Sequence, residues 1–206
     1  AAGFLMEREV AALERVLHSA ERQFVLVLGG AHVSDKIGVI ENVLPRADAL
    51  LLGGGMANTF LKACGYELGR SLVEADKVDE ARRLLALAEQ RGVRVELPVD
   101  VVIAPSLEQP AARRVVQVGV IPADCAVFDI GPETVRRFGE VIASAKLLVW
   151  NGPMGVYEVP EFRDGTRGVA EAVARCAGFT LVGGGDSVAA LHELGMADRV
   201  SHLSTG

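Results

Sequence analysis

The sequence predicts an α/β fold: a doubly wound, Rossmann-like parallel sheet with helices on both faces, in a single domain. Short apolar runs of strand type alternate with stretches of helical period along the 206 residues. Several of these runs end in glycines that are followed at once by a helical pattern, as at Gly53–Gly55 and Gly183–Gly185. Parallel strands need crossover connections, which are right-handed, so this alternation favours a parallel sheet covered on both faces.

Composition narrows the class of protein. Half of the residues are hydrophobic, yet no apolar run approaches the roughly 18 residues of a membrane span. A net charge of -6 without basic runs argues against a nucleic-acid groove. The first residues do not form a basic-then-apolar leader, and Cys64, Cys125 and Cys176 are too widely spaced for a zinc site or a disulfide framework. We therefore expect a cytoplasmic monomer without membrane or nucleic-acid partners.

The first half of the chain alternates between helical and strand patterns. Residues 7–18 carry apolar side chains at the period of an amphipathic helix, and the all-apolar run 24–28 predicts a strand that ends in two glycines. A helical pattern over 33–44 stops before Pro45. The same scheme then repeats, with a strand over 49–52, three glycines, helices over 56–64 and 75–90, and a strand over 93–97.

The second half continues the alternation after one irregular stretch. Residues 98–105 indicate an extended strand, and 106–114 is a polar, aperiodic loop, followed by a short edge strand over 115–120. The remaining pattern is a strand over 126–130, a helix over 133–144, a strand over 147–150, a helix over 161–177, a strand over 179–182, a helix that ends near 194, and a strand over 199–203.

The glycine turns are expected to meet in space. In a doubly wound sheet, the turns from strand to helix lie on the same rim, which is where ligands bind. No repeat of fixed period and no internal linker points to a second domain. The glycines that should converge on this rim are those at 29–30, 53–55, 152, 155 and 183–185.

The turn at Gly183–Gly185 is a candidate anion site. Glycines let the backbone approach a phosphate closely, and the free N–H groups of the following helix point at it. Asp186 comes next and can hold a divalent metal that bridges phosphate oxygens. The alternative is that the glycines only make a tight turn and Asp186 only caps the helix.

Two earlier turns offer complementary chemistry. His32 and Lys36 are spaced one helical turn apart, so both side chains would face phosphates near the positive end of a helix dipole. The alternative is a packed or capping histidine and a solvated lysine. Gly53–Gly55 has no polar side chain and suits a flat group such as a purine, although plain packing of helix on sheet explains it equally well.

The turn after residues 147–150 completes the set. Asn151 offers an amide, Pro153 a rigid apolar wall, and Glu158 a carboxylate that suits ribose hydroxyls, unless it is only an exposed loop acid. None of the turns has the spacing G-x-G-x-x-G of a dinucleotide site, which disfavours an oxidoreductase, and none has the spacing of a P-loop.

The order of these turns along the chain closely resembles phosphoglycerate kinase, and the resemblance covers essentially the whole sequence. The motifs that carry it are AGFLME at 2–7, LGGAHVSDKI at 28–37, GGGMA at 53–57, LPVD at 97–100, DIGP at 129–132, WNGPMGV at 150–156, GGGDS at 183–187 and VSHLSTG at 200–206.

The resemblance is to the C-terminal, nucleotide-binding half of that two-domain enzyme. It implies an interdomain-type helix over 1–20 and a nucleotide-binding domain over 21–206 that is truncated at its C-terminal end. It also implies a missing N-terminal domain that holds 3-phosphoglycerate. The family reversibly transfers a phosphoryl group between 1,3-bisphosphoglycerate and ADP with Mg²⁺, in glycolysis; we expect this chain to bind MgADP or MgATP without turnover. The alternative is a non-catalytic nucleotide-binding module or a degenerate paralogue.

The resemblance also implies a role for each matching residue. The nucleotide would contact Gly30, Ala31, Gly54, Gly55, Val127, Phe128, Asn151, Pro153, Val156 and Glu158. The phosphates would contact Lys36 and Ser187, and Asp186 would hold magnesium. The catalytic set would be His32, Lys36, Gly183, Gly184, Gly185 and Gly206.

Three positions depart from the family pattern. Val127 and Phe128 stand where the family often has glycine and leucine, so that wall of the site differs. His32 stands where the family has a lysine that contacts the transferring phosphoryl group. A lysine stays charged at physiological pH, whereas a histidine, with a reference pKa of about 6.5, is largely neutral at pH 7. We expect nucleotide binding to survive this change more readily than catalysis.

Overall fold

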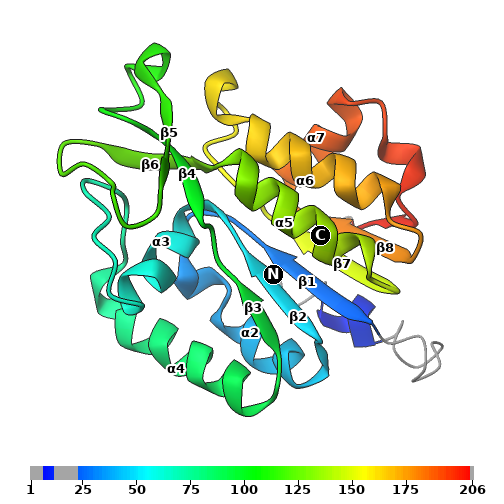
Figure 1. Ribbon diagram of the computed structural model, residues 1–206. Helices are drawn as coiled ribbons and strands as arrows, with labels where there is room; N and C mark the ends of the chain where they lie inside the picture. The colour runs from blue at the N-terminus through cyan, green and yellow to red at the C-terminus, as the bar shows by residue number, and fades with distance from the viewer. Residues whose placement is uncertain (1–6, 12–22, 205–206) are drawn as a thin grey trace.

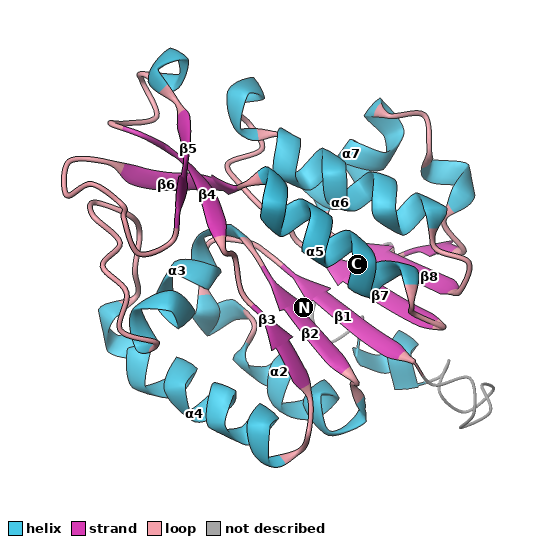
Figure 2. Cartoon of the chain, viewed as in Figure 1, coloured by secondary structure: helices cyan, strands magenta, loops and turns pink. Residues whose placement is uncertain are grey.

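The computed structural model describes residues 7–11 and 23–204, and it contains two sheets (Figures 1 and 2). The larger sheet has six strands in the order β3-β2-β1-β7-β8-β9, and every neighbouring pair is parallel. Its strands are β1 (Phe24–Leu28), β2 (Ala49–Leu52), β3 (Arg94–Glu96), β7 (Leu147–Asn151), β8 (Phe179–Gly183) and β9 (His202–Leu203).

The strand order makes this a doubly wound sheet, as the sequence predicts. The chain runs outward from β1 through β2 to β3, returns to the centre at β7, and then runs the other way through β8 to β9. The direction therefore reverses between β1 and β7. Such a switch point leaves a crevice at the carboxyl ends of the two central strands, because the loops that follow them turn to opposite sides.

Helices cover both faces of the sheet (Figure 1). Alternate residues of β1 point to opposite faces, so Leu26 and Leu28 belong to one buried cluster and Val25 and Val27 to another. The first cluster lies under α2 (Ile37–Val43), α3 (Gly54–Ala63) and α4 (Val78–Gln90). The second lies under α5 (Pro132–Ala143), α6 (Asp164–Arg175) and α7 (Gly185–Glu193).

Several predicted helices have different bounds in the structure. The pattern over 33–44 is split into a 3₁₀ turn at Val33–Asp35, α2, and a second 3₁₀ turn at Leu44–Arg46. Of the predicted helix over 7–18, residues 7–11 are helical and Val10 packs in the first cluster; the remainder lies outside the described residues.

Cys64, Cys125 and Cys176 are free thiols. None of the helices in the described ranges has the length and apolar character needed to cross a membrane.

A second, three-stranded antiparallel sheet was not predicted from the sequence. Its order is β5-β4-β6, formed by β4 (Asp100–Ala104), β5 (Arg114–Gln117) and β6 (Ala126–Ile130). The strands themselves were predicted, but their apolar runs look locally like those of the parallel sheet. They differ from the strands of the parallel sheet only in the strands with which they pair, and a local sequence pattern does not encode that pairing. Figure 1 shows this small sheet standing beyond the end of the large one, next to α3.

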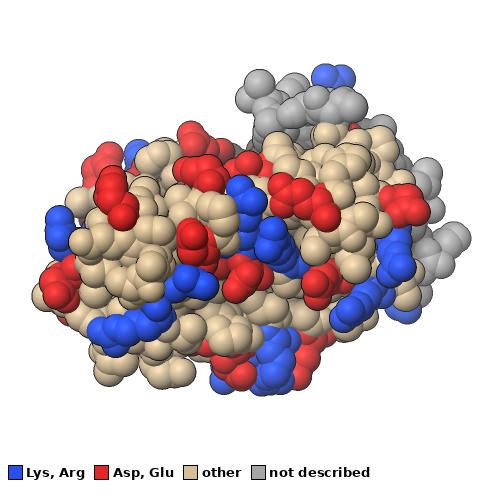
Figure 3. Space-filling view, turned by 90° about the horizontal axis from the view of Figure 1, so that it is seen from above, with Lys and Arg blue, Asp and Glu red and all other residues tan. Residues whose placement is uncertain are grey.

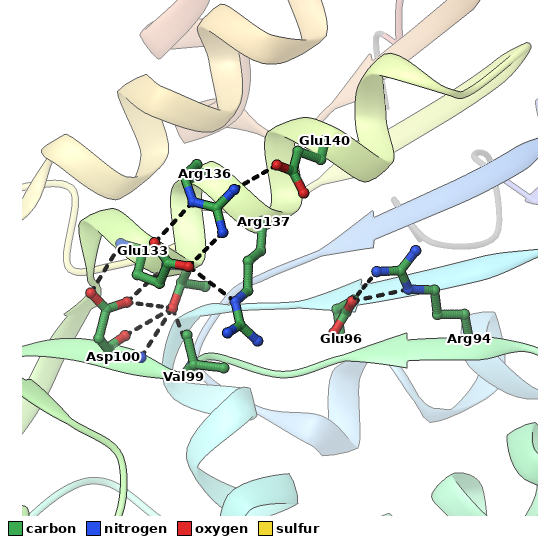
Figure 4. Close-up of polar contacts among 9 residues, drawn as sticks. Arg94, Glu96, Val99, Asp100, Glu133, Arg136, Arg137 and Glu140 are labelled. Atoms are coloured by element: carbon green, nitrogen blue, oxygen red, sulfur yellow. Dashed lines mark hydrogen bonds and ion pairs between the residues drawn. The ribbon is translucent and has the colours of Figure 1, made fainter.

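A buried acid fixes the small sheet to the rest of the fold. Asp100 is 2% exposed, and its carboxylate accepts hydrogen bonds from the backbone N–H groups of Glu133 (3.0 Å) and Thr134 (2.8 Å) (Figure 4). These donors belong to the first turn of α5, whose N-cap residue, Gly131, has no capping side chain. Asp100 therefore caps α5 from a strand of the other sheet, which ties β4 to that helix.

We predict that Asp100→Ala lowers the free energy of unfolding by about 1–3 kcal/mol, because it leaves buried backbone donors of α5 without an acceptor. Urea unfolding followed by circular dichroism measures this. The matched control is Asp79→Ala, which removes a 97% exposed carboxylate paired with Arg82 at 2.7 Å. Such surface pairs contribute about 1 kcal/mol or less. Equal losses in the two variants would contradict the capping role of Asp100.

Candidate functional site

A cavity of about 730 Å³ lies at the carboxyl ends of the central strands, between the two sheets. Turns that follow β1, β2 and β7 form one side, and β4 and β6 form the other. The rim predicted from the glycine turns is therefore one wall of this cavity, and the small sheet is the opposite wall. Ten predicted site residues line it: Gly30, Ala31, Gly54, Gly55, Val127, Phe128, Pro153, Val156, Glu158 and Asp186.

The first three glycine turns approach one another at the distance of backbone contact. Gly30 N–H donates to the Pro153 carbonyl (3.0 Å), and Gly29 N–H donates to the Asn151 carbonyl (2.9 Å). Gly54 has a φ of +70°, and a Cβ added there would lie 2.6 Å from the Gly30 carbonyl oxygen. The close-packing interpretation of this turn is confirmed, and Gly54 and Gly55 also line the cavity, so the interpretation as a site for a flat group stays a prediction.

Lys36 and Asn151 meet at the switch point. The Lys36 ammonium donates a hydrogen bond to the Asn151 Oδ1, and Asn151 is the last residue of β7. Burial lowers the pKa of Lys36, and the nearby Asp35 partly opposes this. No carboxylate forms an ion pair with Lys36 in the described part of the chain. Lys36 is thus a partly buried cation beside the cavity rather than a solvated lysine.

The structure corrects the predicted alignment of His32 with Lys36. His32 has extended backbone and precedes the 3₁₀ turn, and Lys36 follows that turn. Because a 3₁₀ turn has three residues per turn, positions four apart do not share a face. The His32 Nδ1 instead lies 3.9 Å from a Glu74 carboxylate oxygen, with about half of the imidazole exposed. His32 forms no side-chain cap, and it does not line the cavity.

The N-terminus of α7 opens beside the cavity. Gly184 is the N-cap residue with a φ of +90°, so Asp186 lies in the first turn of α7, and its side chain accepts no capping hydrogen bond among the described residues. Asp186 lines the cavity instead. Burial raises the pKa of its carboxyl, and the Glu158 carboxylate raises it further, while Arg163 has the opposite effect. The carboxylates of Asp186 and Glu158 thus lie on one cavity wall, close enough for their charges to interact.

The cavity lining does not include Ser187, Gly183 or Gly185, nor does it include Lys36, Asn151 and Gly184, which are described above. Ser187 is fully buried, and its hydroxyl accepts a hydrogen bond from the Gly152 N–H (3.0 Å), so its side chain holds the neighbouring turn in place. Gly183 ends β8, where it pairs with Asn151, and Gly185 begins α7 with open space around it. Gly206 lies outside the described residues.

Sequence reasoning missed Asp129. This residue of β6 is 2% exposed, lines the cavity, and accepts hydrogen bonds from the backbone N–H groups of Gly165 (2.8 Å) and Ile130 (2.9 Å). Burial raises the pKa of Asp129 to about 8, and the nearby Asp164 raises it as well, against the effect of the two hydrogen bonds. The sequence did contain a signal for Asp129, an acidic residue inside an otherwise apolar strand pattern. Such a residue is seldom buried unless it has a specific structural or functional role.

The chain matches a known protein family along its whole length. The sequence model of the family described as phosphoglycerate kinase matches residues 1–206. The chain belongs to the phosphoglycerate kinase family. A phosphoglycerate kinase of Thermomicrobium roseum is 76% identical over 206 residues, covering 100% of this chain and 53% of the relative. The chain spans about half the length of the curated relatives it matches.

Solved structures of the phosphoglycerate kinase family share the fold. The enzyme of Coxiella burnetii has a TM-score of 0.89 and 42% sequence identity, over 96% of this chain and 51% of that one. The enzyme of Pyrococcus horikoshii has a TM-score of 0.81 and 35% identity, over 98% of this chain and 51% of that one. The α/β architecture described above is therefore that of one part of a phosphoglycerate kinase.

We predict that burial of Lys36 gives the stability of the fold a distinct pH dependence. A lysine whose folded pKa lies below 10.5 binds fewer protons in the folded than in the unfolded state between those two values, so its contribution to stability rises with pH in that window. Below the folded pKa, the contribution is a constant penalty. The free energy of unfolding of the wild type, relative to Lys36→Met, should thus increase as the pH rises towards 10.5.

Urea unfolding at a series of alkaline pH values measures this difference. Lys62→Met is the matched control, because it removes a lysine whose side chain is 43% exposed. The same pH dependence in both variants would contradict the assignment to Lys36.

Proposed function

We propose that the chain is the nucleotide-binding half of a phosphoglycerate kinase and that it binds MgADP or MgATP in the 730 Å³ cavity. The intact enzyme would reversibly transfer a phosphoryl group between 1,3-bisphosphoglycerate and ADP, a step of glycolysis in the cytoplasm. The observation that carries the proposal is that ten residues matched to the family's nucleotide contacts, from five separate segments of the chain, line one cavity.

The adenine would lie between the two walls. Gly54 and Gly55 present bare backbone on one side, and Val127 and Phe128 present apolar side chains on the other. A flat, largely apolar ring suits such a slot, because each face contacts a surface without a competing polar side chain. Beyond the ring, Glu158 would accept hydrogen bonds from the ribose hydroxyls, and Val156 would contact the sugar.

The phosphates would lie between Lys36 and the N-terminus of α7. Lys36 supplies a partly buried cation that forms no ion pair with the carboxylates of residues 7–11 and 23–204, and the first turn of α7 supplies backbone N–H groups at the positive end of its dipole. A cation loses less free energy to desolvation once an anion is beside it, so phosphate binding would raise the pKa of Lys36. Ser187 would act indirectly, by holding Gly152.

Magnesium fits the residues present. Asp186 and Glu158 place two carboxylates on one cavity wall, where burial and then the Glu158 charge raise the pKa of Asp186, an effect that a bound cation would oppose. The described residues contain no group of three or more His, Cys, Asp or Glu that would form a protein-only metal site. That suits magnesium, which often takes one or two carboxylates and completes its shell with phosphate oxygens and water. When bound, it would offset the charge of the transferring phosphoryl group.

Turnover would need the N-terminal domain that holds 3-phosphoglycerate. Phosphoryl transfer requires the two substrates in line and shielded from water, and this chain carries one of the two binding sites. We infer that the chain alone binds nucleotide without transferring phosphate and acts as a monomer. A non-catalytic nucleotide-binding module is the second candidate, favoured by one observation: a half-exposed histidine, His32, stands where the family has a lysine.

We predict that MgADP binds the chain and raises its melting temperature. Asp186→Asn should weaken MgADP binding about tenfold and ADP binding with EDTA much less, because the lost contact is to the metal. Isothermal titration calorimetry with and without EDTA separates the two. Asp198→Asn, which removes an exposed acid, is the matched control. The absence of MgADP binding would refute the nucleotide site, and equal weakening with EDTA would refute the metal role of Asp186.

A further prediction concerns His32 in the full-length enzyme. If His32 contacts the transferring group, activity should fall as the pH rises and the imidazole becomes neutral. His32→Lys should then raise kcat about tenfold at neutral to alkaline pH, because a charge-assisted contact contributes roughly 1.5–3 kcal/mol. The pH–rate profiles of both forms test this. Superimposable profiles would place His32 away from the phosphoryl group and favour a role limited to its contact with Glu74.

A further inference from the structure

Asp129 joins three parts of the fold at the back of the cavity. It lies in β6, next to Phe128, and its carboxylate accepts the Gly165 N–H at the start of α6. Phe128, the residue before Asp129, is also fixed, because its carbonyl accepts a hydrogen bond from the Val156 N–H (2.9 Å). One side chain and one backbone bond therefore connect the small-sheet wall to α6 and to the turn after β7.

The Asp129 carboxyl group is closely packed against two glycines. A Cβ added at Gly155 would lie 2.5 Å from the Asp129 Oδ1, and one added at Gly165 would lie 2.2 Å from the same atom. Neither glycine has a positive φ, so the backbone alone does not require glycine at these positions. The absence of a side chain at both positions leaves room for the Asp129 carboxyl group, and also for the Phe128 carbonyl beside Gly155 and the Ile130 side chain beside Gly165.

We propose that Asp129 is a positioning residue that sets the separation of the two cavity walls and so controls affinity for the adenine ring. The inference rests on the proposed function, because it assigns the slot between Val127, Phe128 and the turn after β7 to adenine. Asp129 would act through these neighbours, since its own carboxyl is held by backbone groups at the back of the slot.

The charge state of Asp129 gives this role a measurable signature. Burial raises the pKa of Asp129 to about 8, so its carboxyl group is mostly neutral at physiological pH. The charged groups around it are mostly acidic: Asp164 on α6 raises its pKa, and Glu158 and Asp186 line the same cavity. Ionisation would place a buried negative charge beside Asp164, which disfavours the closely packed arrangement of the two walls. The hydrogen bonds from Gly165 and Ile130 oppose this effect in part, because they favour the charged form, but burial outweighs them. On β4, Asp100 is engaged with the first turn of α5.

Adenosine is the probe that isolates this effect, because it carries the base and ribose without the phosphates that Lys36 would contact. We expect its Kd for the chain, measured by NMR titration, to be constant below about pH 8 and to rise about tenfold for each pH unit above it. Asp129→Asn, which cannot ionise, should show no such rise. Asp124→Asn, an exposed acid, should retain the wild-type profile.

Two variants outside the cavity keep the test independent of how Asp129→Asn folds. Asp164→Asn removes the neighbouring charge and should move the midpoint of the profile to lower pH. Gly165→Ala pushes against Asp129 from the side of α6 and should weaken adenosine binding at least several-fold below about pH 8. Its matched control, Gly38→Ala, adds a Cβ with no atom within 4 Å and should bind as the wild type does.

The outcomes separate this inference from the proposed function. Binding of MgADP and adenosine with a flat pH profile, or a Gly165→Ala variant that folds and binds adenosine as tightly as the wild type, would overturn the role of Asp129 and leave the nucleotide site intact. Absence of MgADP and adenosine binding at every pH would overturn the nucleotide site and the role of Asp129 with it. A profile that follows Asp129 and Asp164 supports both.

Discussion

Backbone contact between the turns after β1, β2 and β7 is the constraint on which the rest of the structure depends. A Cβ at Gly29 would lie 2.1 Å from the Pro153 carbonyl oxygen, and one at Gly152 would lie 2.4 Å from the Gly29 carbonyl oxygen. A side chain at either glycine would collide with the neighbouring turn, so the sheet reverses direction around bare backbone, with the Met154 side chain packed against Gly29 and Gly53. Backbone donors and acceptors that would otherwise face solvent pair across the turns, and the Ser187 hydroxyl also holds the turn at Gly152.

The sequence predicted the large sheet and the cavity wall that its glycine turns form, because both follow from local signals. Apolar runs that end in glycine identify strand ends, and parallel topology brings those ends together. The antiparallel sheet was missed because the pairing of β4 with β5 and β6 depends on distant partners. His32 and Lys36 were misaligned because a 3₁₀ turn replaces the α-helical one there. Asp129 was overlooked because its acceptor role involves Gly165, far along the chain.

Burial by the surrounding fold disfavours the charged forms of polar groups in and beside the cavity. Burial opposes the charged forms of Lys36, Asp186 and Asp129 alike. On the face seen in Figure 3, by contrast, acidic and basic side chains are interspersed without a broad patch of one sign. The exposed pairs of α5, such as Arg136 with Glu133 (2.6 Å), illustrate this ordinary surface (Figure 4). Electrostatic strain is thus concentrated where a ligand would relieve it.

The strand order also has a consequence for how the chain is made. β1 lies at the centre of the finished sheet, between β2 and β7, yet β7 follows it only after five other strands have been synthesised. Until Leu147–Asn151 emerges from the ribosome, one side of β1 is an unpaired edge of five buried residues, Phe24–Leu28. Such an edge is a template for pairing with another chain. A nascent chain with this strand order would therefore expose a pairing edge until β7 docks, and slow translation between β6 and β7 would prolong that exposure.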